Sequence, residues 1–313
     1  MGYLPVIIII VIGLILIFIS GRKNPDSLSG RIVRKMGLGK SLKDFMKLLE
    51  MEDYEFEMIN VHYRKHDIPK KTGGVRTLHI PSKNLKKVQK KILNKILYTH
   101  KVHPCSYAYR KGKSIVDNAR IHCDSKVLIK MDIRDFFPTV KPEKVKTVFL
   151  KLGWNDEAAN KLTELCSWKN GLPQGAPTSP ALSNIILFEL DKKLFSMARG
   201  FGARYSRYAD DLTFSLKEDD PVRVRSIIKL TQLAVEKEGF RVNFKKGKIN
   251  VLRNHQRQKV CGITVNSKKP TLSRKERRKL RAIRHHVDSN RPATMNVNQL
   301  EGWENFQKMV HGK

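Results

Sequence analysis

Acidic residues are scarce in this chain of 313 residues. Only 29 Asp and Glu stand against 62 Lys and Arg, which gives a formal net charge of +33. That excess of one sign is far larger than solubility needs, so the composition indicates a polyanionic partner.

Cysteine and histidine are present but lack the spacings that their special chemistry requires. The four cysteines have no paired spacing, which argues against a disulfide framework and indicates reduced thiols in a cytosolic compartment. The ten histidines have no Cys or acid beside them at ligand spacing, which argues against a histidine-based metal site. No internal repeat or long low-complexity tract is present. The informative features are therefore the few acids, the basic runs and one long apolar run.

Two of the few acids, Asp210 and Asp211, are adjacent and follow an aromatic-rich run. Residues 211–216 alternate between apolar and polar side chains, which predicts a strand and places the two acids at a hairpin tip. Adjacent carboxylates at a turn repel each other unless they share a cation. A divalent metal held by oxygen ligands is therefore one interpretation, and a solvated Asp-Asp turn is the other.

A third carboxylate, Asp132, belongs to a second predicted strand, residues 127–133, whose apolar side chains occupy the opposite face. An acid presented from a largely apolar strand needs a partner or a metal. An ion pair with Lys130 or Arg134 is one possibility. Taken with the adjacent acid pair, Asp132 instead favours a three-carboxylate site for two Mg²⁺ ions.

Residues 171–184 lie between these acids and begin with Gly and Pro residues that predict a rigid turn. Ser179 is expected to cap the following helix and Pro180 to be its first residue, with an apolar helix continuing through Ile185 to Leu194. A rigid loop of this kind could support a flat base pair with little reorganisation. A plain helix-entry loop is the alternative.

In this order along the chain, the motifs resemble those of a reverse transcriptase. Asp132 begins the first palm motif, residues 171–184 form the second, and Tyr208-Ala209-Asp210-Asp211 forms the third. Residues 70–76 resemble the fingers loop that grips the incoming triphosphate, and residues 239–246 resemble the fourth palm motif. The resemblance implies an RNA-directed DNA polymerase.

The resemblance also implies a role for each motif residue. Asp132, Asp210 and Asp211 would be the catalytic metal ligands for two Mg²⁺ ions, one lowering the pKa of the attacking hydroxyl and the other stabilising the pyrophosphate leaving group. Lys246 would be the catalytic lysine that protonates pyrophosphate, although Lys245 could serve instead. The nucleotide-binding residues would be Lys70, Arg76, Phe137 and Gln174.

Among these, Lys70 and Arg76 would offset triphosphate charge and Gln174 would contact the 3′ side of the nucleotide. Phe137 would lie beneath the incoming sugar and clash with a ribose 2′-OH, which predicts a preference for deoxynucleotides. An ordinary core position is the alternative for Phe137.

Two shorter elements are similar to those of the retron branch of the superfamily, over a match that covers residues 60–313. Asn118-Ala-Arg-Ile-His122 matches the Asn-Ala-x-x-His element, and Val260-Cys261-Gly262 approximates Val-Thr-Gly, with Cys in place of Thr. The resemblance implies RNA recognition by Asn118, His122, Val260 and Gly262. A polar helix surface or a satisfied core histidine is the alternative for Asn118 and His122.

Basic residues gather on two predicted amphipathic helices. The first runs from Asn84 to His100. The second is opened by a capping box from Ser273 to Glu276 and carries seven basic residues against one acid up to Arg284. So many like charges favour phosphates over a merely solvated face, and we expect Arg277, Arg278 and Arg281 to bind RNA with a steep salt dependence.

The longest apolar run is at the start of the chain. Residues 2–21 carry no charge, and residues 3–20 are just long enough for a membrane helix. A cleaved signal peptide would want a basic start and a small-residue cleavage site, and a buried core helix would have little to pack against. A single-span anchor is therefore predicted, and the basic residues after it place the catalytic domain in the cytoplasm, at the inner membrane.

The expected fold class is α+β, a right-hand polymerase with fingers, a palm with an antiparallel sheet and a short helical thumb, plus the transmembrane helix. The predicted domains are the anchor (1–21), a basic linker and N-terminal helices (22–60), fingers and palm (61–265) and a basic helical thumb (266–313). The length leaves no room for an RNase H domain of ordinary size.

The predicted function is a retron-type RNA-directed DNA polymerase that copies part of a cognate structured non-coding RNA into branched RNA–DNA (msDNA), in antiphage defence. Its partners would be that RNA and its DNA product, deoxynucleoside triphosphates, the membrane through residues 3–20, and a retron effector protein. A group II intron-like or stand-alone defence reverse transcriptase is one alternative. A non-catalytic membrane-tethered RNA-binding protein is the other.

Overall fold

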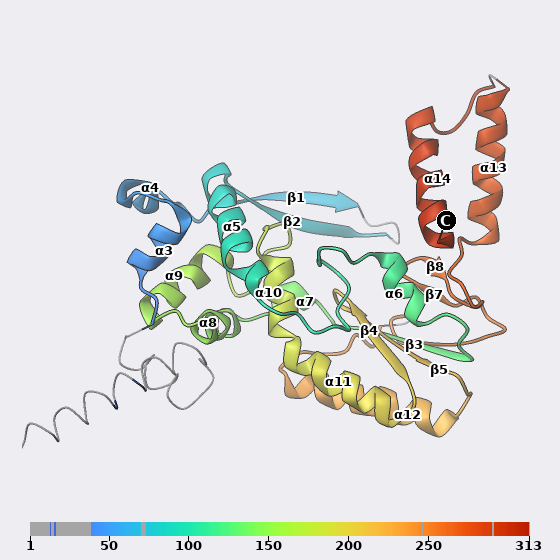
Figure 1. The fold of residues 1–313 in the computed structure, drawn as a ribbon, viewed down its shortest axis with the longest axis horizontal. Helices are drawn as coiled ribbons and strands as arrows, with labels where there is room; N and C mark the ends of the chain where they lie inside the picture. Colours follow the sequence, from blue (N-terminus) through green and yellow to red (C-terminus); the bar gives the residue numbers. More distant parts are fainter. Residues whose placement is uncertain are drawn as a thin grey trace, which may run out of the picture. The chain divides into compact units, whose positions relative to one another are not determined.

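The computed structural model describes residues 39–69, 73–245, 247–289 and 291–312, together with Gly13 and Leu16. The chain divides into two compact units, each described by itself below (Figure 1). The first unit is built from residues 1–102 and 135–187, and the second from residues 103–134 and 188–313. These units divide the chain differently from the domains expected from the sequence, whose boundaries stay a prediction.

The first unit combines one antiparallel hairpin with short helices. The strands are β1 (Tyr63–Pro69) and β2 (Val75–Pro81). The helices are α3 (Leu42–Leu49), α4 (Asp53–Glu57), α5 (Lys83–Lys95), the 3-10 turn η1 (Leu97–Thr99), α7 (Phe136–Thr139), α8 (Pro142–Lys151), α9 (Asp156–Cys166) and α10 (Ser179–Ile186). Ser41 and Asp44 form the capping box that begins α3.

The predicted helix from Asn84 to His100 is present in a shorter form. Helix α5 ends at Lys95, and the 3-10 turn η1 follows it. Its apolar stripe is buried as expected. The same face buries Gln89, whose amide donates to the Tyr63 hydroxyl at 2.6 Å and to the Leu165 carbonyl at 2.8 Å. A buried amide therefore ties α5 to β1 and α9.

The second unit is organised around a four-stranded antiparallel sheet with strand order β4-β5-β3-β6. Its strands are β3 (Val127–Asp132), β4 (Arg204–Tyr208), β5 (Asp211–Leu216) and β6 (Asn250–Arg253), with a separate hairpin of β7 (Lys259–Val260) and β8 (Ile263–Thr264). Its helices are α6 (Ile115–Ile121), α11 (Phe188–Gly200), α12 (Pro221–Lys237), α13 (Arg274–Asp288) and α14 (Val297–His311). The two predicted strands that carry acids, β3 and β5, are confirmed.

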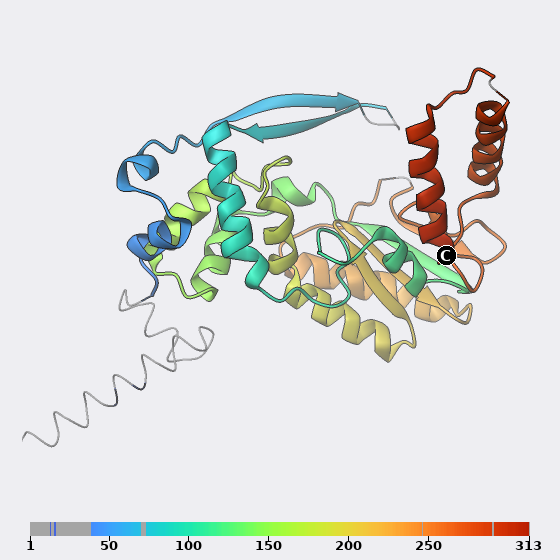
Figure 2. The ribbon, with the colours of Figure 1, turned by 45° about the horizontal axis from the view of Figure 1, so that its top comes forward.

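Both faces of the sheet are covered. Helices α11 and α12 lie side by side on one face and α6 lies on the other (Figures 1 and 2). The two central strands are buried along almost their whole length as a result, including the polar side chains Thr213 and Ser215. A sheet covered on both faces gives a rigid support for residues at the ends of its strands.

The helical pair α13–α14 is attached to this unit by a shared apolar core. Leu280 and Ile283 of α13 and Leu300 of α14 are buried with Val260 of β7 and Leu128 of β3. The predicted capping box of Ser273 and Glu276 begins α13. The apolar stripe of α13 thus faces the core, and its arginines are left on the exposed side.

No helix within residues 39–69, 73–245, 247–289 and 291–312 is long and apolar enough to cross a membrane. The predicted anchor, residues 3–20, lies outside the described residues except for Gly13 and Leu16. It therefore stays a prediction.

Helix α6 is held on the sheet by a buried histidine at its C-terminal end. The two ring nitrogens of His122 lie 2.8 Å from the Ser215 hydroxyl and 2.7 Å from the Ser206 hydroxyl. The ring is fully buried. Burial, reinforced by the charge of Arg204, lowers the pKa of His122 to about 3. The structure therefore shows His122 as a core histidine whose two ring nitrogens both have partners, which is the alternative to an RNA contact.

This buried ring predicts an acid-sensitive fold. His122 must stay neutral in the folded protein, whereas in the unfolded chain it takes up a proton below its ordinary pKa of about 6.5. The contribution of neutral His122 to the free energy of unfolding is therefore fully present above about pH 6.5. It falls towards lower pH, by at most about 1.4 kcal/mol per pH unit, until the pKa of His122 in the folded protein, about 3, is reached. The free energy of unfolding in urea, measured from pH 7 to pH 4, should show this slope for the wild type.

The matched variant is His122→Gln, which can still bond one serine but cannot titrate. We expect it to be less stable at pH 7 and to have a shallower pH slope than the wild type. Equal slopes for the two proteins would contradict the assignment.

Candidate active site

The catalytic candidates Asp210 and Asp211 lie at the tip of the β4–β5 hairpin, as the sequence predicts. Tyr208 pairs with Asp211, so Ala209 and Asp210 form a two-residue connection. Ala209 has a φ of 57°, in the left-handed region that favours glycine. The turn that presents Asp210 is therefore tight and conformationally costly, of the kind that persists only where its surroundings hold it.

The third acid, Asp132, lies beside this turn. It is the last residue of β3 and stands directly opposite Asp211 in the register of β3 with β5. The next amide along, Ile133 N–H, donates to the Asp210 carbonyl at 3.0 Å. Three acids that are distant in the sequence are thus brought together at one end of the sheet.

Burial and neighbouring negative charges raise the pKa of two of the three carboxylates. Burial is the largest cause of the raised pKa of Asp210, which reaches about 6, and the charges of Asp211 and Asp132 add to it. Burial also raises the pKa of Asp211, against the opposing charge of Lys130. A site that disfavours its own negative charges in this way would be stabilised by an added cation.

Asp132 has partners that the sequence does not identify. The Asn243 amide donates to one carboxylate oxygen at 2.8 Å, and the Lys248 ammonium lies 3.2 Å from the other. Asn243 lies within the predicted motif of residues 239–246, and Lys248 is two residues beyond that motif. Lys246 itself lies outside the described residues, so its catalytic role stays a prediction.

The three acids do not form a ready-made metal cluster. Within the part of the chain that the structure describes, no group of three or more His, Cys, Asp or Glu side chains is arranged to hold a metal ion. The donor chemistry nevertheless fits Mg²⁺, which prefers carboxylate oxygens, and the charges of neighbouring acids contribute to the raised pKa of Asp210 and of Asp211. Binding two ions would require the carboxylates to leave their present partners.

The nucleotide-binding candidates belong to the first unit, where residues 171–184 link two of them. Gln174 accepts a hydrogen bond at its carbonyl from His79 of β2, at 2.6 Å, and Phe137 accepts one at its carbonyl from Leu172, at 2.9 Å. Arg76 is exposed on β2, and Phe137 is half-buried in α7. Lys70 lies outside the described residues. Direct contact of any of the four with a nucleotide stays a prediction.

Two glycines explain why the loop of residues 171–184 has its composition. A Cβ at Gly171 would lie 2.3 Å from the Pro138 carbonyl oxygen, and one at Gly175 would lie 2.8 Å from the His79 carbonyl oxygen. Gly175 also has a φ of 122°. The loop can therefore lie against α7 and β2 only without side chains at these two positions, which supports the interpretation of a rigid platform.

The helix that follows this loop differs in detail from the prediction. Thr178 is the N-cap and Ser179 the first helical residue, because the Ser179 hydroxyl donates to the Pro173 carbonyl at 2.8 Å and is not free to cap. The apolar helix expected through Leu194 is two helices, α10 and α11, divided at Leu187.

The two retron-like elements contact each other in the second unit. The Asn118 amide lies 3.3 Å from the Cys261 sulfur, and both Asn118 and Val260 are buried. Of the four residues predicted to contact RNA, Gly262 is the one that is exposed, with a φ of 85°, in the turn between β7 and β8. Asn118, His122 and Val260 thus have interior positions, and direct RNA contact by their side chains is not what the structure favours. The contact of Asn118 with Cys261 supports the exposed turn, whereas His122 holds α6 on the sheet.

The arginines predicted to bind RNA are placed as expected. Arg277, Arg278 and Arg281 are exposed on α13, on the side away from its buried Leu280 and Ile283. Because the apolar stripe packs α13 against the core, the exposed arginines are held on one side of a fixed helix. RNA binding by these three arginines stays a prediction.

The crowding of carboxylates generates a stability prediction. Because the pKa of Asp210 is raised above its unfolded value, its charged form opposes folding at neutral pH. The variant Asp210→Asn should therefore unfold with a free energy larger than the wild type by about 1–3 kcal/mol, measured in urea at pH 7.5 with a chelator present.

The control is Asp219→Asn, which removes an exposed carboxylate paired with Arg253 at 2.7 Å. Exposed pairs contribute little, so this change should lower stability by about 0–1 kcal/mol. A destabilised Asp210→Asn protein would show that the carboxylates do not crowd one another as the geometry indicates.

Comparison with known proteins agrees with this arrangement. Residues 68–278 match the family model described as reverse transcriptase (RNA-dependent DNA polymerase). The Retron Ec86 reverse transcriptase of Escherichia coli is 31% identical over 302 residues, covering 93% of this chain and 92% of the relative. The Retron Mx65 reverse transcriptase of Myxococcus xanthus is 35% identical over 268 residues, covering 80% of this chain but only 62% of the relative.

Among solved structures, telomerase from Candida albicans shares the fold, with a TM-score of 0.51 and 11% identity over 71% of this chain and 48% of that one. At that identity the likeness concerns the fold alone. The family model, the Ec86 relative and the three acids at the end of one sheet lead to one conclusion: the chain belongs to the reverse transcriptase family, and within it to the retron reverse transcriptases.

Proposed function

We propose that this reverse transcriptase copies part of a cognate structured non-coding RNA into msDNA, a branched product in which RNA and DNA are covalently joined. The observation that carries the catalytic part is the register of β3 with β5, which brings Asp132 opposite Asp211 and beside the Asp210 turn. The retron relatives support the RNA-specific part. Priming would start from a 2′-OH of the same RNA.

Asp132, Asp210 and Asp211 would hold two Mg²⁺ ions. When bound, the ions would lower the pKa of the attacking hydroxyl and neutralise charge on the pyrophosphate that leaves. Lys246 would protonate that leaving group. Arg76 and Lys70 would pair with the triphosphate, Gln174 would bind the 3′ side of the nucleotide, and Phe137 would exclude a ribose 2′-OH.

Two surfaces of the second unit would bind the RNA and its product. The exposed arginines of α13 would contact backbone phosphates, in a manner independent of base sequence. The turn at Gly262 would contact the cognate RNA directly, while Asn118, His122 and Val260 would hold that turn and α6 in place.

The product provides the test of this proposal. Nucleic acid that copurifies with the protein, expressed together with its flanking genomic DNA, should contain RNA and DNA in one covalent molecule. Ribonuclease treatment should leave DNA of defined length with a short RNA remnant that a 2′,5′-debranching enzyme releases. Sequencing that DNA would identify the template.

The variant Asp210→Asn should yield no such DNA because one proposed metal ligand has lost its charge, with an activity loss of at least about 10³-fold. The exposed-acid variant Asp219→Asn should yield as much as the wild type. Linear DNA without a branch in the wild type would contradict the retron reaction and favour a stand-alone polymerase.

We further propose that residues 3–20 anchor the protein in the inner membrane, with the polymerase in the cytoplasm, and that the anchor places the RNA–DNA complex beside an effector that acts during phage defence. The support is the uncharged run of residues 2–21, followed by Arg22 and Lys23.

Removing residues 1–21 should therefore leave DNA synthesis unchanged, move the protein from the membrane to the soluble fraction, and abolish protection against phage. The control replaces residues 3–20 with an unrelated single-span helix of the same length, which should restore protection. Full protection by the truncated protein would reject the anchoring role.

A further inference from the structure

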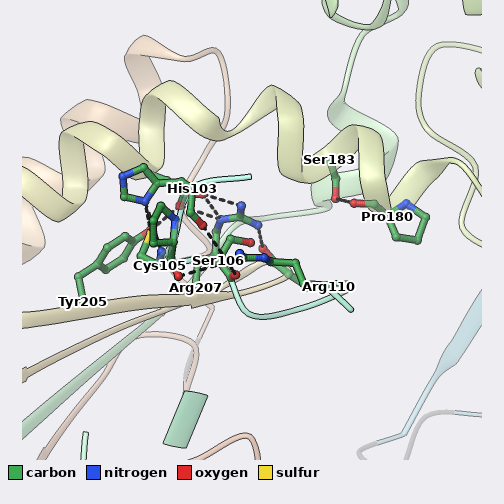
Figure 3. A network of polar contacts seen from close by, with 11 residues as sticks. His103, Cys105, Ser106, Arg110, Pro180, Ser183, Tyr205 and Arg207 are labelled. Atoms are coloured by element: carbon green, nitrogen blue, oxygen red, sulfur yellow. Dashed lines mark hydrogen bonds and ion pairs between the residues drawn. The ribbon is translucent and has the colours of Figure 1, made fainter. Parts of the chain in front are cut away.

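A network of polar contacts involves α11, β4 and residues 103–110, and one of its members contacts the catalytic turn (Figure 3). At its centre Arg207 and Asp191 are both completely buried. The Arg207 guanidinium donates through Nε at 2.8 Å to one Asp191 oxygen and through a terminal nitrogen at 2.6 Å to the other. This is the two-pronged geometry that a guanidinium forms with a carboxylate.

Asp191 also has polar neighbours other than Arg207. The Tyr205 hydroxyl donates to it at 3.1 Å. Burial and the nearby Asp191 charge raise the pKa of the Cys105 thiol, whose sulfur lies 3.0 Å from His103 Nδ1. The carboxylate is therefore held in one orientation by its surroundings, and it fixes the guanidinium in turn.

The remaining arm of Arg207 reaches the catalytic turn. Its second terminal nitrogen donates to the Ala209 carbonyl at 2.9 Å. That carbonyl belongs to the peptide bond between Ala209 and Asp210, so holding it fixes the peptide plane that precedes Asp210. On the other side, the Asp210 carbonyl accepts from Ile133 N–H at 3.0 Å. The backbone of Asp210 is thus held from both sides.

Residue 207 is itself held by the backbone. Its N–H donates to the Cys105 carbonyl at 2.8 Å, and its carbonyl accepts from Tyr107 N–H at 2.9 Å, so residues 105–107 extend the sheet beside β4. Both the backbone and the side chain of Arg207 are therefore fixed before the turn begins.

We propose that Arg207 is a positioning residue for catalysis, which directs the Asp210 carboxylate by clamping the Ala209–Asp210 peptide while Asp191 holds its guanidinium. The inference rests on the catalytic role proposed for Asp210. It accounts for two observations at once: a non-glycine residue with a positive φ in the turn, and a costly buried ion pair next to it. A buried pair is weak evidence for stability, because desolvation offsets the attraction between its charges.

The geometry requires arginine rather than any cation. A lysine could keep the charge opposite Asp191, but its compact ammonium cannot span Asp191 and the Ala209 carbonyl in the fixed directions of a guanidinium. The variant Arg207→Lys therefore keeps a positive charge beside Asp191 but loses the simultaneous hydrogen bond to the Ala209 carbonyl. Tyr205→Phe is the matched control, since it removes a hydrogen bond to Asp191 and leaves the Arg207–Ala209 contact intact.

The experiment measures three properties of the full-length wild type, Arg207→Lys and Tyr205→Phe. They are the melting temperature, the steady-state kcat and KM for dTTP on poly(rA)·oligo(dT), and the Mn²⁺ dissociation constant from the electron paramagnetic resonance signal of free Mn²⁺. The generic template makes the assay independent of any cognate RNA, so failure of the retron proposal would not affect it.

We expect Arg207→Lys to lower kcat about tenfold with KM for dTTP changed by less than about twofold, and to weaken Mn²⁺ binding several-fold. Tyr205→Phe should lose some thermal stability and keep both kcat and Mn²⁺ affinity. If the two variants lose activity in proportion to their melting temperatures, or if Arg207→Lys binds Mn²⁺ as the wild type does, the clamp is rejected.

Should Arg207→Lys not fold, the double variant Arg207→Met with Asp191→Asn removes both buried charges together and avoids an unpaired one. It should fold, with the same loss of kcat and Mn²⁺ affinity; wild-type values would overturn the proposal. Failure of the proposed metal site is a separate result, because it would appear in the wild type as an absence of Mn²⁺ binding.

Discussion

The pairing of β3 with β5 in a single register determines where the acids of this protein meet. Ile129 stands opposite Phe214 in that register, both completely buried, and Asp132 stands opposite Asp211 at the strand ends. A slip of one residue would turn every side chain to the other face, so the apolar pairs that build the core also fix the carboxylates. Like charges directly opposite each other destabilise a sheet, and burial adds to that cost. The rest of the strand pair therefore has to offset the unfavourable electrostatics at its end.

Cations of the chain relieve part of this repulsion. Lys248 contacts Asp132, and Lys130 acts on Asp211, in a protein whose net charge is +33. The Lys248 side chain is 46% exposed, and ion pairs at exposed positions contribute little, so a divalent ion has only a weak competitor to displace. The absence of a preformed metal cluster among the described residues is therefore compatible with the gathering of three acidic residues at this site. The acids are held close by the backbone, and their side chains have partners that can be exchanged.

Local patterns in the sequence predicted what depends on local physics. Periodicity predicts the strands of Asp132 and Asp211 and the hairpin tip at Asp210, and cap chemistry predicts the capping box at Ser273. The structure confirms all of these. The contacts of Asn243 and Lys248 with Asp132, more than a hundred residues away, depend on tertiary placement that no spacing reveals. The shift of the helix cap to Thr178 has the same origin, because the Ser179 hydroxyl is taken by a carbonyl of the preceding loop. Resemblance found Asn118, His122 and Val260 but could not show that they are buried.

Because Asn118, His122 and Val260 are buried, the two retron-like elements have a structural role in the core of the second unit. Asn118 and Cys261 are in contact although 143 residues separate them, and Val260 shares a core with α6 and α13. The Asn118 side-chain nitrogen contacts the Cys261 sulfur, whereas the Asn118 side-chain oxygen has no hydrogen-bond partner among the described residues. The contact between Asn118 and Cys261 therefore joins the two elements, beside the exposed turn at Gly262.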